Sequence, residues 1–137
     1  MGRSAGSIFA INAVAKLPNS RIKGLILESS IADLPQRFEQ RLDGPEFAGQ
    51  RDSILTELAR NFNHQKSIEK LACPLMVMHT VNDHLVPAWH GKKNANWART
   101  EAILFEKGDH NSIQQLNSPQ YQLELKNFIQ KVSTPAQ

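Results

Sequence analysis

The stretch CPLMVMHTVNDHLVP, residues 73–87, joins a short apolar run to a polar loop. The run at 75–79 lacks the alternation of polar and apolar residues that a half-exposed strand shows. Such a run is typical of a strand that is covered on both faces, as in parallel sheets. We therefore predict a buried strand at 75–79, a loop at 80–87 and a helix from about 88 to 97.

The same order of strand, loop and helix recurs on both sides of this stretch. Upstream, the run IKGLIL at 22–27 predicts a second buried strand, preceded by a short and largely apolar helix at 7–16. Downstream, 101–106 predicts a third strand, and Ser118-Pro119 predicts the start of a last helix, with an N-cap serine and proline at the first helical position. Strands that alternate with helices predict an α/β fold with parallel strands and right-handed connections.

Residues 31–70 lose strand character between two strand signals. The patterns of 34–42 and 50–62 predict two amphipathic helices, and 67–71 predicts a short third one. We interpret this segment as a helical, lid-like insertion within a single domain that spans residues 1–137. A lid controls access to a site, so we expect its apolar residues to contact substrate: Leu34, Phe38 and Phe47.

Composition argues against several classes of protein. The 137 residues carry a net charge of only +3, with the basic residues scattered, which disfavours nucleic-acid binding. No apolar run approaches the roughly 18 residues of a membrane span. The single cysteine cannot form an internal disulfide, which favours a reduced, cytoplasmic setting.

Polar residues follow three elements of the predicted sheet. Ser4 lies within Gly2-Arg3-Ser4-Ala5-Gly6, Asp83 follows the strand at 75–79, and His110 follows the strand at 101–106. Loops that leave the carboxyl ends of parallel strands meet at one edge of the sheet. A histidine there could take the proton of the serine hydroxyl, and a carboxylate could fix the tautomer of that histidine. The order along the chain is Ser, Asp, His.

Other polar residues remain as alternatives. Asp109 adjoins His110 and more readily shapes the loop, while Glu28 ends a strand; both stay open as the acid. His79, His84 and His90 are spaced by 5 and 6 residues, which places no two on one helical face, so we expect no metal site and no cofactor. His79 is expected to be a strand-end residue that hydrogen-bonds a loop.

Three motifs, GRSAGS, CPLMVMHTVNDHLVP and GDHN, resemble the nucleophile elbow, acid segment and histidine loop of α/β-hydrolase fold serine hydrolases. The resemblance is greatest to the serine aminopeptidase-like and prolyl-oligopeptidase-like branch and extends over the C-terminal half of that fold. Thr80 stands where the family usually has glycine. The resemblance implies that Ser4 is the nucleophile, His110 the base and Asp83 the acid.

The resemblance also implies hydrolysis of an ester, thioester or peptide bond in a small-molecule ester or peptide substrate. The backbone N–H of Ala5, at the start of a helix, would be one donor to the oxyanion. A non-catalytic remnant that serves as an interaction or assembly module is the alternative function.

The G-x-S-x-G pattern begins at the second residue, whereas a complete fold carries strands before it. We therefore expect a fragment that has lost its N-terminal half and the strand leading to Ser4. The strand at 22–27 would then lie at an open edge, which favours self-association, and hydrolysis by the chain alone would be weak.

Overall fold

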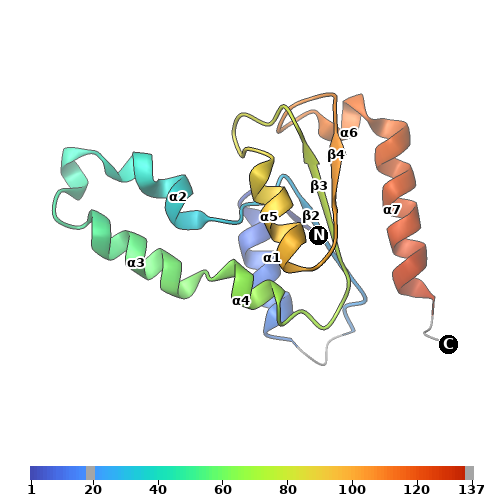
Figure 1. Cartoon of the computed structure of the whole chain (residues 1–137), viewed down its shortest axis with the longest axis horizontal. Coiled ribbons are helices and arrows are strands. Elements are labelled where there is room, and N and C mark those ends of the chain that lie inside the picture. Colours follow the sequence, from blue (N-terminus) through green and yellow to red (C-terminus); the bar gives the residue numbers. More distant parts are fainter. Residues whose placement is uncertain (18–20, 135–137) are drawn as a thin grey trace.

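The computed structural model describes residues 1–17 and 21–134 and contains a parallel sheet in the order β1-β2-β3-β4 (Figure 1). The strands are β1 Gly2–Arg3, β2 Leu25–Glu28, β3 Leu75–Thr80 and β4 Ala102–Phe105. The helices are α1 Gly6–Ala15, α2 Leu34–Glu39, α3 Arg51–Asn61, α4 His64–Ile68, α5 Trp89–Trp97, α6 Ile113–Leu116 and α7 Ser118–Ser133, with 3-10 turns η1 Gln40–Leu42 and η2 Pro45–Phe47. The predicted α/β fold with parallel strands is confirmed.

Helices cover both faces of the sheet, which explains the continuous apolar runs of its strands. Alternate residues of β3 point to opposite faces, so Val77 packs with α1 and α5 on one side while Met78 packs with α7 on the other. Figure 1 shows α7 on the side of the sheet opposite α1 and α5. The apolar residues of the central strands β2 and β3 therefore pack against a helix layer on either face.

One sequence-based prediction about the sheet is wrong. We expected no part of the strand before Ser4, yet Gly2 pairs with Leu27 and Arg3 pairs with Glu28 in parallel register. The Ser4 N–H extends this ladder by donating to the Glu28 carbonyl over 3.0 Å. Two residues are enough to form a strand here, because β2 offers N–H and C=O groups that are otherwise unpaired along this edge. Self-association through the edge stays a prediction.

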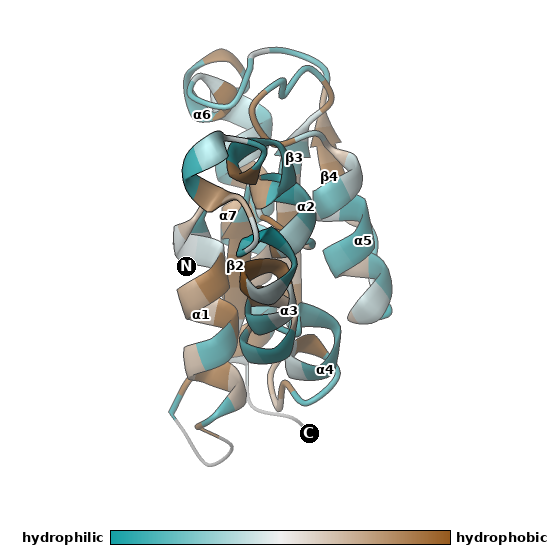
Figure 2. Ribbon diagram, turned by 90° about the vertical axis from the view of Figure 1, so that its left-hand side faces the viewer, coloured by the Kyte–Doolittle hydropathy of each residue, from teal (hydrophilic) through white to brown (hydrophobic). Residues whose placement is uncertain are grey.

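The segment 31–70 is helical and extends away from the sheet as α2 and α3 (Figure 1). Figure 2 shows hydrophilic colouring over much of α3, whereas α1 carries a larger hydrophobic part. The segment is attached through an apolar cluster in which Ile8 and Val86 pack against Leu34, Leu58 and Phe62. Through this cluster, the segment contacts α1 and the loop that follows β3.

Several element boundaries differ from those expected. The third short helix begins at His64 rather than 67, because the Asn63 side chain caps it by accepting from the Lys66 N–H over 2.9 Å. The last helix is preceded by Asn117 at the N-cap, and Ser118 is already helical. The strand predicted at 22–27 begins three residues later and ends one residue later, at Leu25–Glu28.

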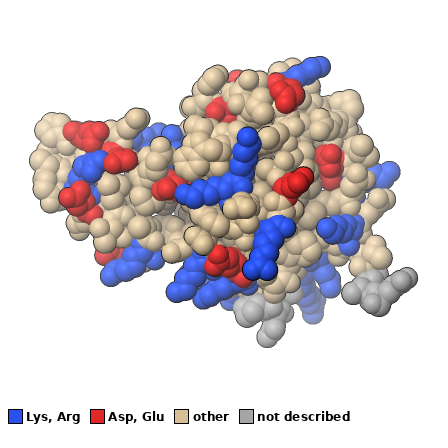
Figure 3. Space-filling view, in the orientation of Figure 1, with Lys and Arg blue, Asp and Glu red and all other residues tan. Residues whose placement is uncertain are grey.

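Charges of both signs are interspersed on the face shown in Figure 3. Within residues 1–17 and 21–134, no helix is both long and apolar enough to cross a membrane.

Candidate active site

Ser4 lies on a sharp turn between β1 and α1. Its backbone has a positive φ of 49°, a strained conformation for a residue with a side chain. The turn is held by Ser7, whose N–H and hydroxyl donate to the Ser4 carbonyl over 3.0 and 2.6 Å. A Cβ on Gly2 would lie 2.7 Å from the Ala10 Cβ, so glycine allows the strand to approach the helix. The turn leaves the Ser4 side chain half-buried and accessible.

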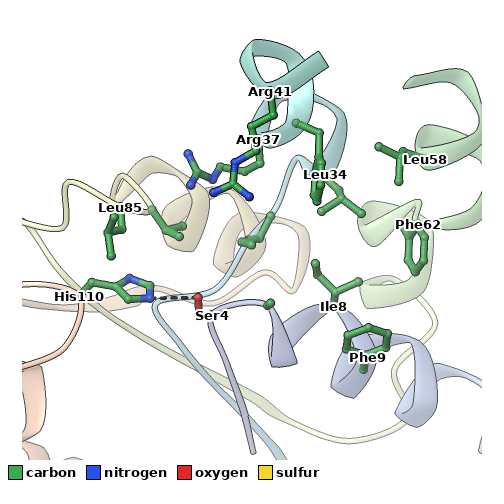
Figure 4. Close-up of a pocket in the computed structure, with 14 residues that line it drawn as sticks. Ser4, Ile8, Phe9, Leu34, Arg37, Arg41, Leu58, Phe62, Leu85 and His110 are labelled. Atoms are coloured by element: carbon green, nitrogen blue, oxygen red, sulfur yellow. Dashed lines mark hydrogen bonds between the residues drawn. The ribbon is translucent and has the colours of Figure 1, made fainter. Parts of the chain in front are cut away.

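The loops after β3 and β4 bring Asp83 and His110 to Ser4. The Ser4 Oγ lies 3.0 Å from His110 Nε2 (Figure 4), and His110 Nδ1 lies 2.7 Å from Asp83 Oδ2. A carboxylate only accepts, so Nδ1 carries the proton and Nε2 is free to accept the serine hydroxyl. Of the residues expected at the site, these three form one continuous chain of hydrogen bonds.

Asp83 is buried, and its carboxylate accepts hydrogen bonds from several donors. Oδ1 accepts from the N–H groups of Leu85 and Val86 over 3.0 and 2.8 Å. His79 Nε2 lies 2.7 Å from the Val86 carbonyl and 3.3 Å from Asp83 Oδ2, which confirms His79 as a strand-end residue bonded to a loop. Burial opposes the charged form, but the hydrogen bonds from His79, Val86 and His110 outweigh it and hold the pKa of Asp83 well below its usual range.

The loop that carries His110 is fixed on two sides. Thr80 Oγ1 lies 3.1 Å from the carbonyl oxygens of both Phe105 and Gly108, so this residue connects the two loops of the site. The Asp109 carboxylate accepts from the N–H of Asn111 over 2.9 Å and from the Ser112 hydroxyl over 2.7 Å. Asp109 therefore bonds within its own loop, as the sequence suggested.

Glu28 has different partners from those expected of an acid that orients His110. It is 4% exposed, and its Oε1 accepts from Arg3 Nε over 2.7 Å while Oε2 accepts from the Tyr121 hydroxyl. Arg3 in turn donates to the carbonyl of His110. Burial and then Glu28 raise the pKa of Tyr121. Glu28 thus reaches the backbone of the histidine loop through Arg3, a link that sequence reasoning missed.

The N–H of Ala5 lies at the N-terminal end of α1. Within the described ranges, this N–H donates no hydrogen bond. A free N–H beside the serine, at the positive end of a helix dipole, favours a developing negative charge.

A cavity of about 480 Å³ opens beside Ser4 and His110 beneath α2 and α3 (Figure 4). Most of its lining is apolar: Ile8, Phe9, Leu34, Phe38, Leu58 and Phe62. Two of the three predicted contact residues, Leu34 and Phe38, are in this lining. Phe47 lies in η2, outside the described residues that line the cavity, because the chain has turned away after α2. Its predicted contact with substrate gains no support from this position.

Sequence reasoning missed two cationic residues of the cavity, Arg37 and Arg41. A signal for them was available. They stand 3 and 7 residues after Leu34, and Phe38 stands 4 after it, which is the spacing of one helical face.

His84 and His90 differ in burial and in their contacts. His84 is exposed on a loop, while His90 is buried in α5 and its Nδ1 accepts from the Ala32 N–H over 3.2 Å. Burial, and then the charge of Arg37, lower the pKa of His90 to about 4. Among the residues that the structure describes, no group of three His, Cys, Asp or Glu side chains could hold a metal ion.

No protein-family model matches the chain, and no curated protein matches its sequence. Solved structures do match its fold. Acylaminoacyl peptidase of Pyrococcus horikoshii aligns with a TM-score of 0.72 at 18% identity, covering 99% of this chain and 24% of that one. Est1E of Butyrivibrio proteoclasticus aligns with a TM-score of 0.67 at 14% identity, covering 93% and 60%.

A puromycin-hydrolyzing peptidase of Mycobacterium tuberculosis aligns with a TM-score of 0.61 at 20% identity, covering 80% of this chain and 18% of that one. The chain thus spans about a quarter of the length of the acylaminoacyl peptidase. At these identities the likeness concerns the fold. Together with the parallel sheet and the turn that carries Ser4, it shows that this chain has the α/β-hydrolase fold over the part of that fold that it spans.

Proposed function

We propose that this chain carries the catalytic residues of a serine hydrolase acting on an ester, thioester or peptide bond. The observation that supports this best is the hydrogen-bonded series from Ser4 through His110 to Asp83, with separations of 3.0 and 2.7 Å. The strained backbone of Ser4 and the adjacent apolar cavity support it further.

The proposed reaction begins when His110 Nε2 removes the proton of Ser4 Oγ as that oxygen attacks the carbonyl carbon of the substrate. Asp83 holds the Nδ1 proton in place and stabilises the imidazolium that forms. The Ala5 N–H donates to the oxyanion. His110 then gives its proton to the leaving group. In the second half of the reaction, His110 Nε2 takes a proton from water as the water oxygen attacks the acyl carbon, and the bond from that carbon to Ser4 Oγ breaks as the proton passes to Oγ.

The segment 31–70 acts in this proposal as a lid over the acyl pocket. Leu34 and Phe38 from α2, Leu58 from α3 and Phe62, which follows α3, are part of the lining of this cavity. Removing the segment should therefore alter preference among acyl chain lengths more than it alters the sheet. Unchanged selectivity after such a deletion would contradict the lid.

Labelling with a fluorophosphonate probe tests the proposal, because the probe reacts with a serine only when a base activates its hydroxyl. Peptide mass spectrometry should find the label on Ser4, and Ser4→Ala should abolish it. His110→Ala should slow labelling by at least about a thousandfold. Ser67→Ala, which removes an unrelated hydroxyl bonded to Asn12, is the matched control and should leave the rate unchanged. A folded chain that never labels would favour a non-catalytic module.

A further inference from the structure

Two arginines in the cavity have no role in the proposed reaction. Arg37 and Arg41 line the same cavity as Ser4 and His110. Among the described side chains, neither arginine forms an ion pair with a carboxylate. By contrast, Arg51 in α3 lies 2.8 Å from Glu39.

A guanidinium at a cavity that has no carboxylate partner is available to an anionic ligand. Arg41 lies over the Phe38 ring, 5.9 Å from its centroid, and Arg37 is half-buried. The Arg37 charge also lowers the pKa of buried His90, so it destabilises a positive charge on a neighbour. Two guanidinium groups provide several N–H donors in fixed planes, which suit the paired oxygens of a carboxylate or phosphate.

The position of these groups indicates which part of a substrate they would meet. In Figure 4 the two guanidinium groups lie above the pair formed by Ser4 and His110, while Ile8, Phe9 and Phe62 lie on the side of Ser4 away from His110. The leaving group must lie toward His110, because Nε2 gives it a proton. The acyl chain therefore extends toward the apolar wall, and the leaving group extends toward the arginines.

We propose that the substrate joins an apolar acyl chain to a leaving group that carries a carboxylate or phosphate, which Arg37 and Arg41 bind. This inference rests on the proposed function. A bond forms between Ser4 Oγ and the acyl carbon, and the bond from that carbon to the oxygen or sulfur of the leaving group breaks. The serine proton passes through His110 to the leaving group, which departs as a free anionic alcohol or thiol, and water then hydrolyses the acyl-serine.

Binding of stable analogues tests the inference without turnover. The probe is a ketone in which CH₂ replaces the sulfur of the octanoyl thioester of mercaptopropionate, and the neutral control carries a hydroxymethyl group in place of its carboxylate. Calorimetric titration of the full chain should show that the carboxylate binds about tenfold more tightly than the neutral ketone. Arg37→Gln and Arg41→Gln should each reduce this preference roughly threefold, and the double variant should abolish it.

Arg60→Gln is the matched control, because Arg60 pairs with Glu57 on α3 and does not line the cavity. It should keep the full preference. A second ketone with a phosphate in place of the carboxylate identifies the anion: whichever binds more tightly in an arginine-dependent way is the preferred group. Equal binding of charged and neutral ketones, or a preference that survives the double variant, would overturn the inference.

The outcome is distinguishable from failure of the proposed function. Loss of fluorophosphonate labelling at Ser4 would contradict the hydrolase while leaving the binding preference measurable. Normal labelling with no arginine-dependent preference would contradict the anionic leaving group alone. The circular dichroism spectrum of the double variant should match that of the parent chain, because both side chains reach solvent. A matching spectrum shows that a loss of preference is not caused by unfolding.

Discussion

Two regions of the molecule differ in burial and in the reach of their side-chain hydrogen bonds. One is the sheet with the loops at the carboxyl ends of its strands, and the other is the helical segment 31–70. In β3 every residue from 75 to 80 is buried, whereas α3, a longer element, has no buried residue. The loops after β3 and β4 add side-chain bonds that reach across the chain, such as Thr80 to the Gly108 carbonyl. Among the described residues, the side-chain bonds of α3 join residues of the same helix or reach back only to Glu39 and Asp43. The comparison indicates a rigid frame for the reacting groups and a looser cover for the substrate.

The largest effect should follow from changing the acid in the rigid frame. Asp83→Asn removes the carboxylate that holds the His110 Nδ1 proton, so the rate of fluorophosphonate labelling at Ser4 should fall by roughly a thousandfold. Asp109→Asn is the matched control, because its carboxylate bonds only within its own loop, and it should change the rate less than threefold. If Asp83→Asn were silent while Glu28→Gln abolished labelling, Glu28 would be the acid.

Hydrogen exchange should separate the two regions directly. Amides of β3 should exchange only through large unfolding events, while those of α3 should exchange at least about a hundredfold faster through local opening. The matched helix is α5, which packs on the sheet through buried Asn94 and Ala95 and should resemble β3. Equal protection of α3 and α5, measured by mass spectrometry at one pH, would contradict the looser cover.

The close approach of β1 and α1 should be sensitive to a single methyl group. Gly2→Ala places a Cβ 2.7 Å from that of Ala10 and should lower the free energy of unfolding by about 1 to 3 kcal/mol. Gly6→Ala is the matched control, because the added Cβ meets no atom within 4 Å apart from its chain neighbours and its own helix backbone, and alanine favours the helix. It should leave stability unchanged or raise it in a urea titration. A neutral Gly2→Ala would show that the strand and helix can separate without cost.

The smallest effect should come from the junction between the two regions, where His90 bonds the chain at Ala32. A histidine whose pKa is lowered to about 4 stays neutral in the folded state while its unfolded counterpart takes up a proton near 6.5. Stability should therefore fall as the pH drops from about 6.5 to about 4, by on the order of 1 kcal/mol between pH 7 and pH 5.

His90→Asn removes the titration while its Oδ1 can still accept from the Ala32 N–H, so the pH dependence of thermal unfolding should weaken. It should not vanish, because burial also lowers the pKa of His64. His84→Asn, at an exposed position, is the control and should leave the pH dependence intact. An unchanged pH profile for His90→Asn would show that His90 does not contribute.

The sequence by itself determined the parallel α/β fold and the three loops that meet at Ser4. Both depend on local information: apolar runs of the right length give the strands, and the carboxyl ends of parallel strands share one edge. Ser4, Asp83 and His110 could be picked out because their order and neighbours repeat a motif. Boundaries were less predictable, since a side-chain cap such as that of Asn63 moves a helix start by a few residues.

Only the tertiary structure decided which groups act on one another. Arg3 and Glu28 are 25 residues apart. The bond between them, and the bond from Arg3 to the His110 carbonyl, depend on the register of β1 against β2. The cavity likewise includes Arg37 but not Phe47, although both lie in the same helical segment. Periodicity specifies the face of a helix, but the point at which the chain turns away depends on packing between distant elements.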